Sequence, residues 1–153
     1  MNNDYLIQKE RLAVVLTTVS GERIAGQLFV QPNVRLRSGR EEAPDILNAA
    51  EPFFPFLADG GHILLLAKDR VRDLLLPAEL EEEEWRIGAG QELEVMLDDG
   101  ACHRGVLYLE AITGRARVLD YLNRVGERFL TLHTDGGSML INRDRIERVR
   151  PLE

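Results

Sequence analysis

The sequence contains one cysteine, three histidines and few aromatic residues, and these scarcities exclude several classes of protein. Cys102 has no second cysteine with which to form an intrachain disulfide, and a cysteine-rich zinc site is excluded for the same reason. No phosphate-binding loop, dinucleotide-binding fingerprint or nucleophile elbow is present. We therefore predict a protein that has no cofactor and is not an enzyme.

Long apolar runs are also lacking at the start of the chain. The first twenty residues carry several charges, and their one uninterrupted apolar stretch spans residues 12–16. This stretch is too short for the core of a signal peptide or for a membrane span. We expect a cytoplasmic protein that does not bind a membrane.

The histidines do not form a pattern typical of a metal site. Among His62, His103 and His133, only His103 has a potential ligand beside it, Cys102. Adjacent residues of a strand point to opposite faces, so these two side chains should not meet at one metal ion. We predict ordinary surface or turn histidines and no metal site.

Negative charge is concentrated in one segment of the chain. The formal net charge is −7, and residues 78–90 contribute −4 of it, with five acidic residues and one basic residue. The flanking parts are therefore close to neutral. A general polyanion-binding surface is not indicated, whereas a local basic face stays open.

The chain contains an internal repeat. A shift of 75 residues aligns the later parts of the two copies, and a shift of 79 aligns their earlier parts, which predicts a four-residue insertion near residues 32–35. The matched residues are Gly39-Arg40 with Gly114-Arg115, Asp45 with Asp120, Asn48 with Asn123, residues 64–71 with 139–146, Gly21 with Gly100, and Gly26 with Gly105. We predict a first repeat with an N-terminal extension over 1–76, an acidic linker over 77–90 with a short helix at 78–86, and a second repeat over 91–153.

Each copy has the pattern of five short strands. Residues at the start of each copy alternate with the period of a half-buried strand, and Ser20-Gly21 and Asp99-Gly100 are typical of hairpin turns. We expect a turn at each Asp-x-Leu-Asn segment and a short 3₁₀ turn at residues 68–70 and 143–145. The predicted fold class is mainly β, with two tandem small β-barrels.

The spacing Gly21-x-x-x-x-Gly26-x-Leu28, with its counterpart from Gly100 to Leu107, resembles the first half of the Sm-like motif of SH3-like small barrels. Asp45 with Asn48, and Asp120 with Asn123, lie where that family carries an Asp and an Asn. The resemblance implies an RNA-binding module that forms rings. Two five-stranded barrels with a terminal Ile-x-x-Val also resemble bacterial chemotaxis coupling proteins, and that resemblance implies a non-catalytic scaffold.

The candidate binding residues are polar side chains that recur in both copies. Asn48 and Asn123 offer amide groups to a base edge or a peptide backbone, although Asp and Asn also stabilise turns without any ligand. The candidates are Asp45, Asn48, Lys68, Arg70, Asp120, Asn123, Arg143 and Arg145.

The acidic balance, and the absence of the Arg-Gly pair of the Sm-like family, favour a protein-interaction scaffold over the alternative of an RNA-binding protein. Arg148 and Arg150 would share a strand face, which suits a charged edge that resists aggregation. Because small open barrels leave strand edges unpaired, we expect self-association into a homo-oligomer, either a dimer or a trimeric ring, or binding to a protein partner.

Overall fold

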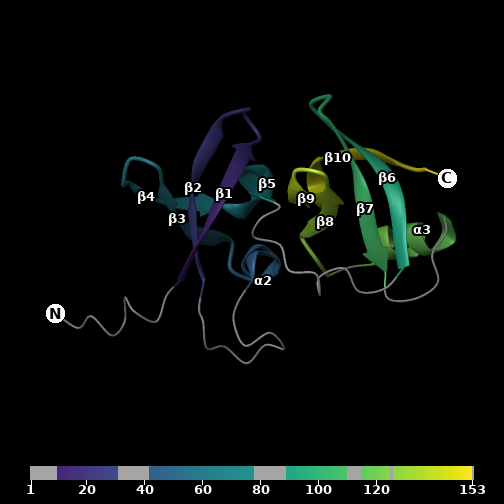
Figure 1. The fold of residues 1–153 in the computed structure, drawn as a ribbon, viewed down its shortest axis with the longest axis horizontal. Coiled ribbons are helices and arrows are strands. Elements are labelled where there is room, and N and C mark those ends of the chain that lie inside the picture. Colours follow the sequence, from purple (N-terminus) through teal and green to yellow (C-terminus); the bar gives the residue numbers. More distant parts are fainter. Residues whose placement is uncertain (1–9, 31–41, 78–88, 110–114, 125, 153) are drawn as a thin grey trace. The chain divides into compact units, whose positions relative to one another are not determined.

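The computed structural model describes residues 10–30, 42–77, 89–109, 115–124 and 126–152 (Figure 1). The chain divides into two compact units, residues 1–76 and 77–153. The predicted linker helix at 78–86, the insertion at 32–35 and the Gly39-Arg40 pair lie outside the described residues. Each unit is described by itself below.

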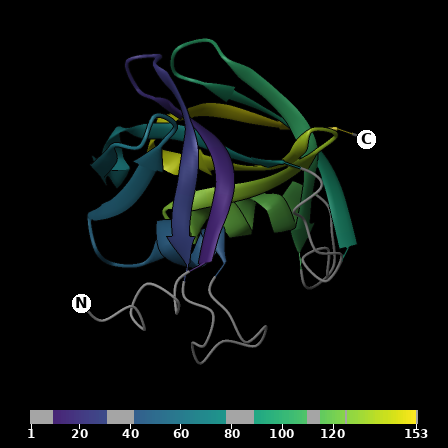
Figure 2. The ribbon, with the colours of Figure 1, turned by 60° about the vertical axis from the view of Figure 1, so that its left-hand side comes forward.

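The first unit is built from five antiparallel strands and one short helix. Its elements are β1 (Glu10–Thr18), β2 (Arg23–Val30), α2 (Ala43–Asn48), β3 (Phe53–Ala58), β4 (Ile63–Ala67), the 3₁₀ turn η1 (Lys68–Arg70) and β5 (Val71–Pro77). The strands lie in the order β5-β1-β2-β3-β4. Figures 1 and 2 show β1 and β2 as long, bent strands.

The second unit has the same order of elements. It contains β6 (Ala89–Leu97), β7 (Cys102–Leu109), α3 (Arg115–Asn123), β8 (Phe129–Thr134), β9 (Gly137–Asn142), the 3₁₀ turn η4 (Arg143–Arg145) and β10 (Ile146–Pro151). The strands lie in the order β10-β6-β7-β8-β9. The prediction of a mainly β chain is therefore confirmed, as are both 3₁₀ turns. Among the described residues, no strand pair joins β4 to β5 or β9 to β10, so the strand order is open and the prediction of two small barrels is not confirmed.

Alternating side chains build the core of each unit. In β1, Val14 and Leu16 are buried and Val15 between them is half-buried, which is the period of two expected of a strand. In the second unit, Leu93, Val95 and Leu97 of β6 pack into one buried cluster with side chains from β7, α3, β8 and β9.

Two tight turns, and two places where neighbouring strands lie very close together, explain the matched glycines. Gly21 and Gly100 have φ angles of 94° and 91°, a backbone conformation that favours glycine, at the β1–β2 and β6–β7 hairpins. A Cβ on Gly26 would overlap the Leu57 main-chain oxygen, and a Cβ on Gly105 would lie 2.5 Å from the His133 oxygen. Glycine therefore lets β2 cross close to β3, and β7 close to β8.

The Asp-x-Leu-Asn segments are helices, so the prediction of turns was wrong. Asp45 and Asn48 lie in α2, and Asn48 is its last residue; Asp120 and Asn123 lie in α3, and Asn123 is its last residue. In α2 the helix begins after Glu42, whose main-chain N–H donates to Asp45 Oδ2 at 2.9 Å, and Pro44 occupies the first turn. This reciprocal cap, together with a proline in the first turn, favours a helix over an isolated turn.

Candidate functional site

In each unit, one predicted cation reaches the C-terminal end of the helix. In the first unit, the Nζ of Lys68 donates to the main-chain oxygen of Ala49 at 3.0 Å, just beyond the last residue of α2. The Lys68 side chain is only 1% exposed. A cation at a helix C-terminus is stabilised by the helix dipole and by the unpaired carbonyl groups there.

Arg143 has the corresponding place in the second unit. Its guanidinium donates to the main-chain oxygens of Tyr121 and Arg124, each at 3.4 Å, and to that of Leu122, all at the end of α3. The guanidinium carbon also lies 5.5 Å from the centre of the Tyr121 ring. Lys68 and Arg143 thus use their donors to hold the helices of their own units.

Tyr121 ties the end of α3 to the segment that follows it. Its hydroxyl donates to Glu127 Oε1 at 2.6 Å. Burial of the ring, followed by the hydrogen bond to Glu127, raises the pKa of Tyr121 well above its ordinary value. The phenol therefore stays protonated, and able to donate to Glu127, to a higher pH than an ordinary tyrosine.

The other candidates lie at the surface or in local ion pairs. Arg70, Asp45, Asp120 and Asn123 are exposed, and Asn48 is half-buried. Arg145 Nη1 lies 3.3 Å from Asp98 Oδ2, which joins η4 to the β6–β7 turn. The structure does not bring these side chains into one pocket with a shared ligand-binding geometry.

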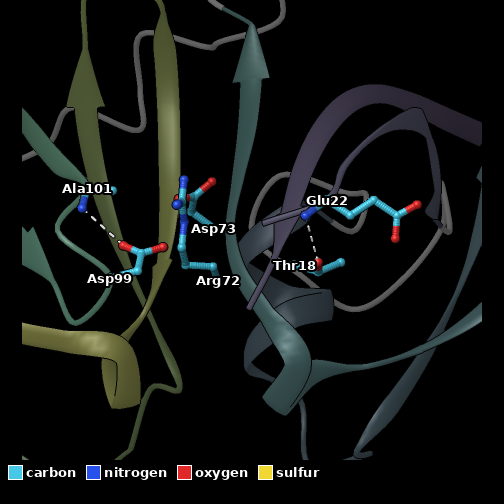
Figure 3. A network of polar contacts seen from close by, with 6 residues as sticks. All are labelled: Thr18, Glu22, Arg72, Asp73, Asp99 and Ala101. Carbon is cyan, nitrogen blue, oxygen red and sulfur yellow. Dashed lines mark hydrogen bonds and ion pairs between the residues drawn. The ribbon is translucent and has the colours of Figure 1, made fainter. Parts of the chain in front are cut away.

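Figure 3 shows how polar side chains define the hairpin turns. The main-chain N–H of Glu22 donates to Thr18 Oγ1 at 3.1 Å, and that of Ala101 donates to Asp99 Oδ1 at 3.0 Å. Asp99 therefore stabilises the turn, as predicted for an Asp-Gly hairpin. In the same view, Arg72 Nε donates to Asp73 Oδ2 at 2.8 Å on β5.

Charged residues form a ladder across β10, β6 and β7. Glu94 lies opposite Arg150 on one side and Arg104 on the other, with oxygen–nitrogen distances of 3.1 and 4.0 Å. The hydrogen bond from Arg150 lowers the pKa of Glu94, and Glu94 in turn raises the pKa of Arg150. Because this face is solvent-exposed, the ladder contributes little to stability.

The histidines occupy unrelated positions. His62 is exposed in the β3–β4 turn, whereas His133 is buried in β8, with Nδ1 3.2 Å from Ser138 Oγ and its ring against Tyr108. In the ranges that the structure describes, no group of three histidine, cysteine or acidic residues could hold a metal ion.

An exposed apolar surface on the first unit is the feature that sequence reasoning missed. Phe53, Ile63 and Leu65 are 58%, 59% and 72% exposed. In the β3–β4 register, Phe53 is opposite Ala67, Pro55 opposite Leu65, and Leu57 opposite Ile63, so these alternate residues share one side of the hairpin. We call this surface, made of Phe53, Pro55, Leu57, Ile63, Leu65 and Ala67, the β3–β4 face.

The backbone of β4 adds unpaired polar groups to this surface. Ala58 N–H donates to the His62 oxygen and Lys68 N–H to the Pro52 oxygen, so His62, Leu64, Leu66 and Lys68 direct their main-chain groups toward β3. The alternation then directs the main-chain groups of Ile63, Leu65 and Ala67 to the other side. Within the described ranges, no strand pairs with that side of β4.

β10 also has a neighbour on one side only among the described strands, and its edge is different in character. Leu152 N–H donates to the Glu92 oxygen, so Arg148 and Arg150 direct their main-chain groups toward β6, and Val149 and Pro151 direct theirs outward. Pro151 has no N–H, and the β10–β6 register shifts between Ile146 and Arg148. Proline, charge and an irregular register are the devices that protect strand edges from pairing.

No helix among the described residues is long and apolar enough to cross a membrane. Comparisons with protein-family models, with curated proteins and with solved structures find no match to this chain. The resemblances to the Sm-like and chemotaxis coupling families therefore rest on the sequence patterns alone.

Proposed function

We propose that this protein is a non-catalytic, cytoplasmic interaction module built from two copies of a small open barrel, and that it associates with a second copy of itself through the β4 side of the β3–β4 face. The observation that carries the proposal is the contiguous exposure of Phe53, Ile63 and Leu65 on neighbouring positions of β3 and β4. Large apolar groups gathered on one side of a hairpin typically mark an interaction surface.

A second copy suits this surface because β4 carries no charge from Ile63 to Ala67. A charged partner would therefore find no counter-charge on this strand, although the chain as a whole has a net charge of −7. Two identical apolar strands can lie side by side without leaving a charge unpaired.

RNA binding has less support from the described side chains. Lys68 and Arg143, two of the four candidate cations, already donate to main-chain oxygens in their own units. Three of the four exposed large apolar side chains among the described residues lie on β3 and β4, and neither strand carries a basic residue. Stacking of bases would require aromatic rings beside cations.

Sedimentation velocity across micromolar concentrations tests the proposal. We expect the wild-type chain to self-associate reversibly, and the double variant Ile63→Thr/Leu65→Thr to associate about tenfold or more weakly, because each substitution removes buried apolar area. Threonine keeps the β propensity of the strand. The matched control is Leu119→Thr, since Leu119 is also 59% exposed but lies on α3. A wild-type chain that stays monomeric throughout would contradict the proposal.

A further inference from the structure

The geometry points to a specific mode of association, which rests on the proposed function: β4 of one chain pairs with β4 of a second copy, antiparallel, about a twofold axis at Leu65. The pairing joins the two sheets edge to edge. The occupant of the free side of β4 is thus the same strand of another molecule.

The backbone of β4 is self-complementary in this register. The main-chain groups of Ile63, Leu65 and Ala67 point away from β3. With Leu65 opposite Leu65 of the second copy, Ile63 faces Ala67 of that copy, and Ala67 faces its Ile63. The three outward-facing residues of each strand then form about six backbone hydrogen bonds between the chains.

The side chains also fit this register. Leu65, the most exposed of them at 72%, lies directly against its counterpart, and Ile63 lies against Ala67 of the second copy. Cross-strand apolar neighbours at this distance stabilise a pair of strands. The paired strand, Ile63–Ala67, carries no charged residue, so no two like charges face each other within the pairing.

Pairing of β4 with β10 of a second copy is disfavoured by the features of β10. That arrangement would set a strand with Glu147, Arg148 and Arg150 beside an uncharged strand. The missing N–H of Pro151 would leave one hydrogen bond unmade on the outward side of β10. An isologous contact through β4 avoids both costs and closes at two chains.

A charge exchange at Leu65 tests this pairing. In Leu65→Lys and in Leu65→Glu, identical charges meet at the axis, so each variant alone should associate about tenfold or more weakly than the wild type. An equimolar mixture should recover association, because Lys then faces Glu. Sedimentation velocity measures all three samples, and recovery in the mixture shows that both variants are folded.

Two controls separate this mode from other contacts. Phe53→Thr alters the β3–β4 face one strand away from the axis and should leave the dissociation constant within about threefold of the wild type. Arg148→Thr/Arg150→Thr on β10 should do the same.

Any other result shows which part of the proposal is wrong. If the single-charge variants are weakened and their mixture is not restored, Leu65 does not meet itself and the twofold pairing is overturned, while self-association stands. Loss of association in Phe53→Thr would indicate face-to-face packing, and loss in the β10 variant would indicate a head-to-tail chain or ring; either overturns the pairing. A monomeric wild type would overturn the proposed function as well.

Discussion

Gly26 and Gly105 are residues at which the packing of strands in each unit depends directly on the absence of a side chain. Each lies where a strand crosses close to the next one, β2 over β3 and β7 over β8. Their φ angles are outside the left-handed region, so the requirement is for space and not for an unusual backbone conformation. A substitution at either position must therefore separate two strands or displace a core side chain.

Gly26→Ala should lower the free energy of unfolding by about 1–3 kcal/mol, because its Cβ would lie 2.6 Å from a ring carbon of the buried Phe56. Urea denaturation followed by circular dichroism measures the loss. Gly136→Ala is the matched control: a Cβ there meets only Thr134 Oγ1, at 3.9 Å, and its stability should stay within about 0.5 kcal/mol. Equal stabilities for the two variants would show that β2 and β3 separate without cost.

At the scale of elements, each helix is held by a cation from a 3₁₀ turn far along the chain. Lys68 of η1 reaches the end of α2, and Arg143 of η4 reaches the end of α3. α2 has six residues and is too short to be stable by itself. Its position therefore depends on its capping contacts and on the burial of Ala43 and Leu47.

Lys68→Met should cost about 1–3 kcal/mol of stability, since it leaves the Ala49 oxygen without its charged donor while filling nearly the same volume. Thermal or urea unfolding provides the measurement. Arg70→Ala, in the same 3₁₀ turn but exposed, should change stability by no more than about 0.5 kcal/mol. A Lys68→Met chain as stable as the wild type would mean that this contact does not hold α2.

The strands could be predicted from the sequence because their signals are local. Alternation in β1 and β6, and the glycines that end their hairpins, depend on residues only a few positions apart. The helices were missed because Asp and Asn suggested turns, although Glu42, Pro44 and Asp45 together form a recognisable helix start.

The surface that carries the proposed function could not be read from the sequence. An apolar run such as Ile63–Ala67 is typical of a buried strand. Ile63 and Leu65 are nevertheless exposed, and β4 lies at the end of the strand order with β3 as its one neighbour among the described strands. Likewise, the contacts of Lys68 and Arg143 join residues 19 to 22 positions apart, a distance at which sequence spacing gives no information on contact.

At the scale of the whole molecule, the two units share an order of elements and differ in the surfaces they present. The first carries the apolar β3–β4 face, whereas the second carries the ladder of Glu94, Arg104 and Arg150. Two units with the same order of elements can thus each keep a buried core while their surfaces differ. Neither of these surfaces accounts for the negative net charge of the chain, because more than half of that charge lies in residues 78–90.

This charge makes the salt dependence of association informative. Two chains of net charge −7 repel each other, and salt screens that repulsion, so self-association through apolar strands should strengthen as salt rises. Binding to a nucleic acid weakens under the same change because counterions are released on binding. Sedimentation at increasing sodium chloride concentrations measures the trend. Association that weakens with salt would indicate that charged groups, and not the β3–β4 face, make the contact.

Pro55 has a mechanical consequence for the strand that we propose to pair. Leu57 and Pro55 direct their main-chain groups toward β2, and Pro55 has no N–H to donate. The register of β2 with β3 therefore covers only three pairs, from Gly26–Ala58 to Leu28–Phe56. β3 and β4, in contrast, share five pairs. β2 therefore pairs with the β3–β4 hairpin only along the half nearest the hairpin turn. In the proposed pairing, the half of the hairpin that β2 does not hold would let β4 match the twist of the second strand without breaking a β1–β2 pair.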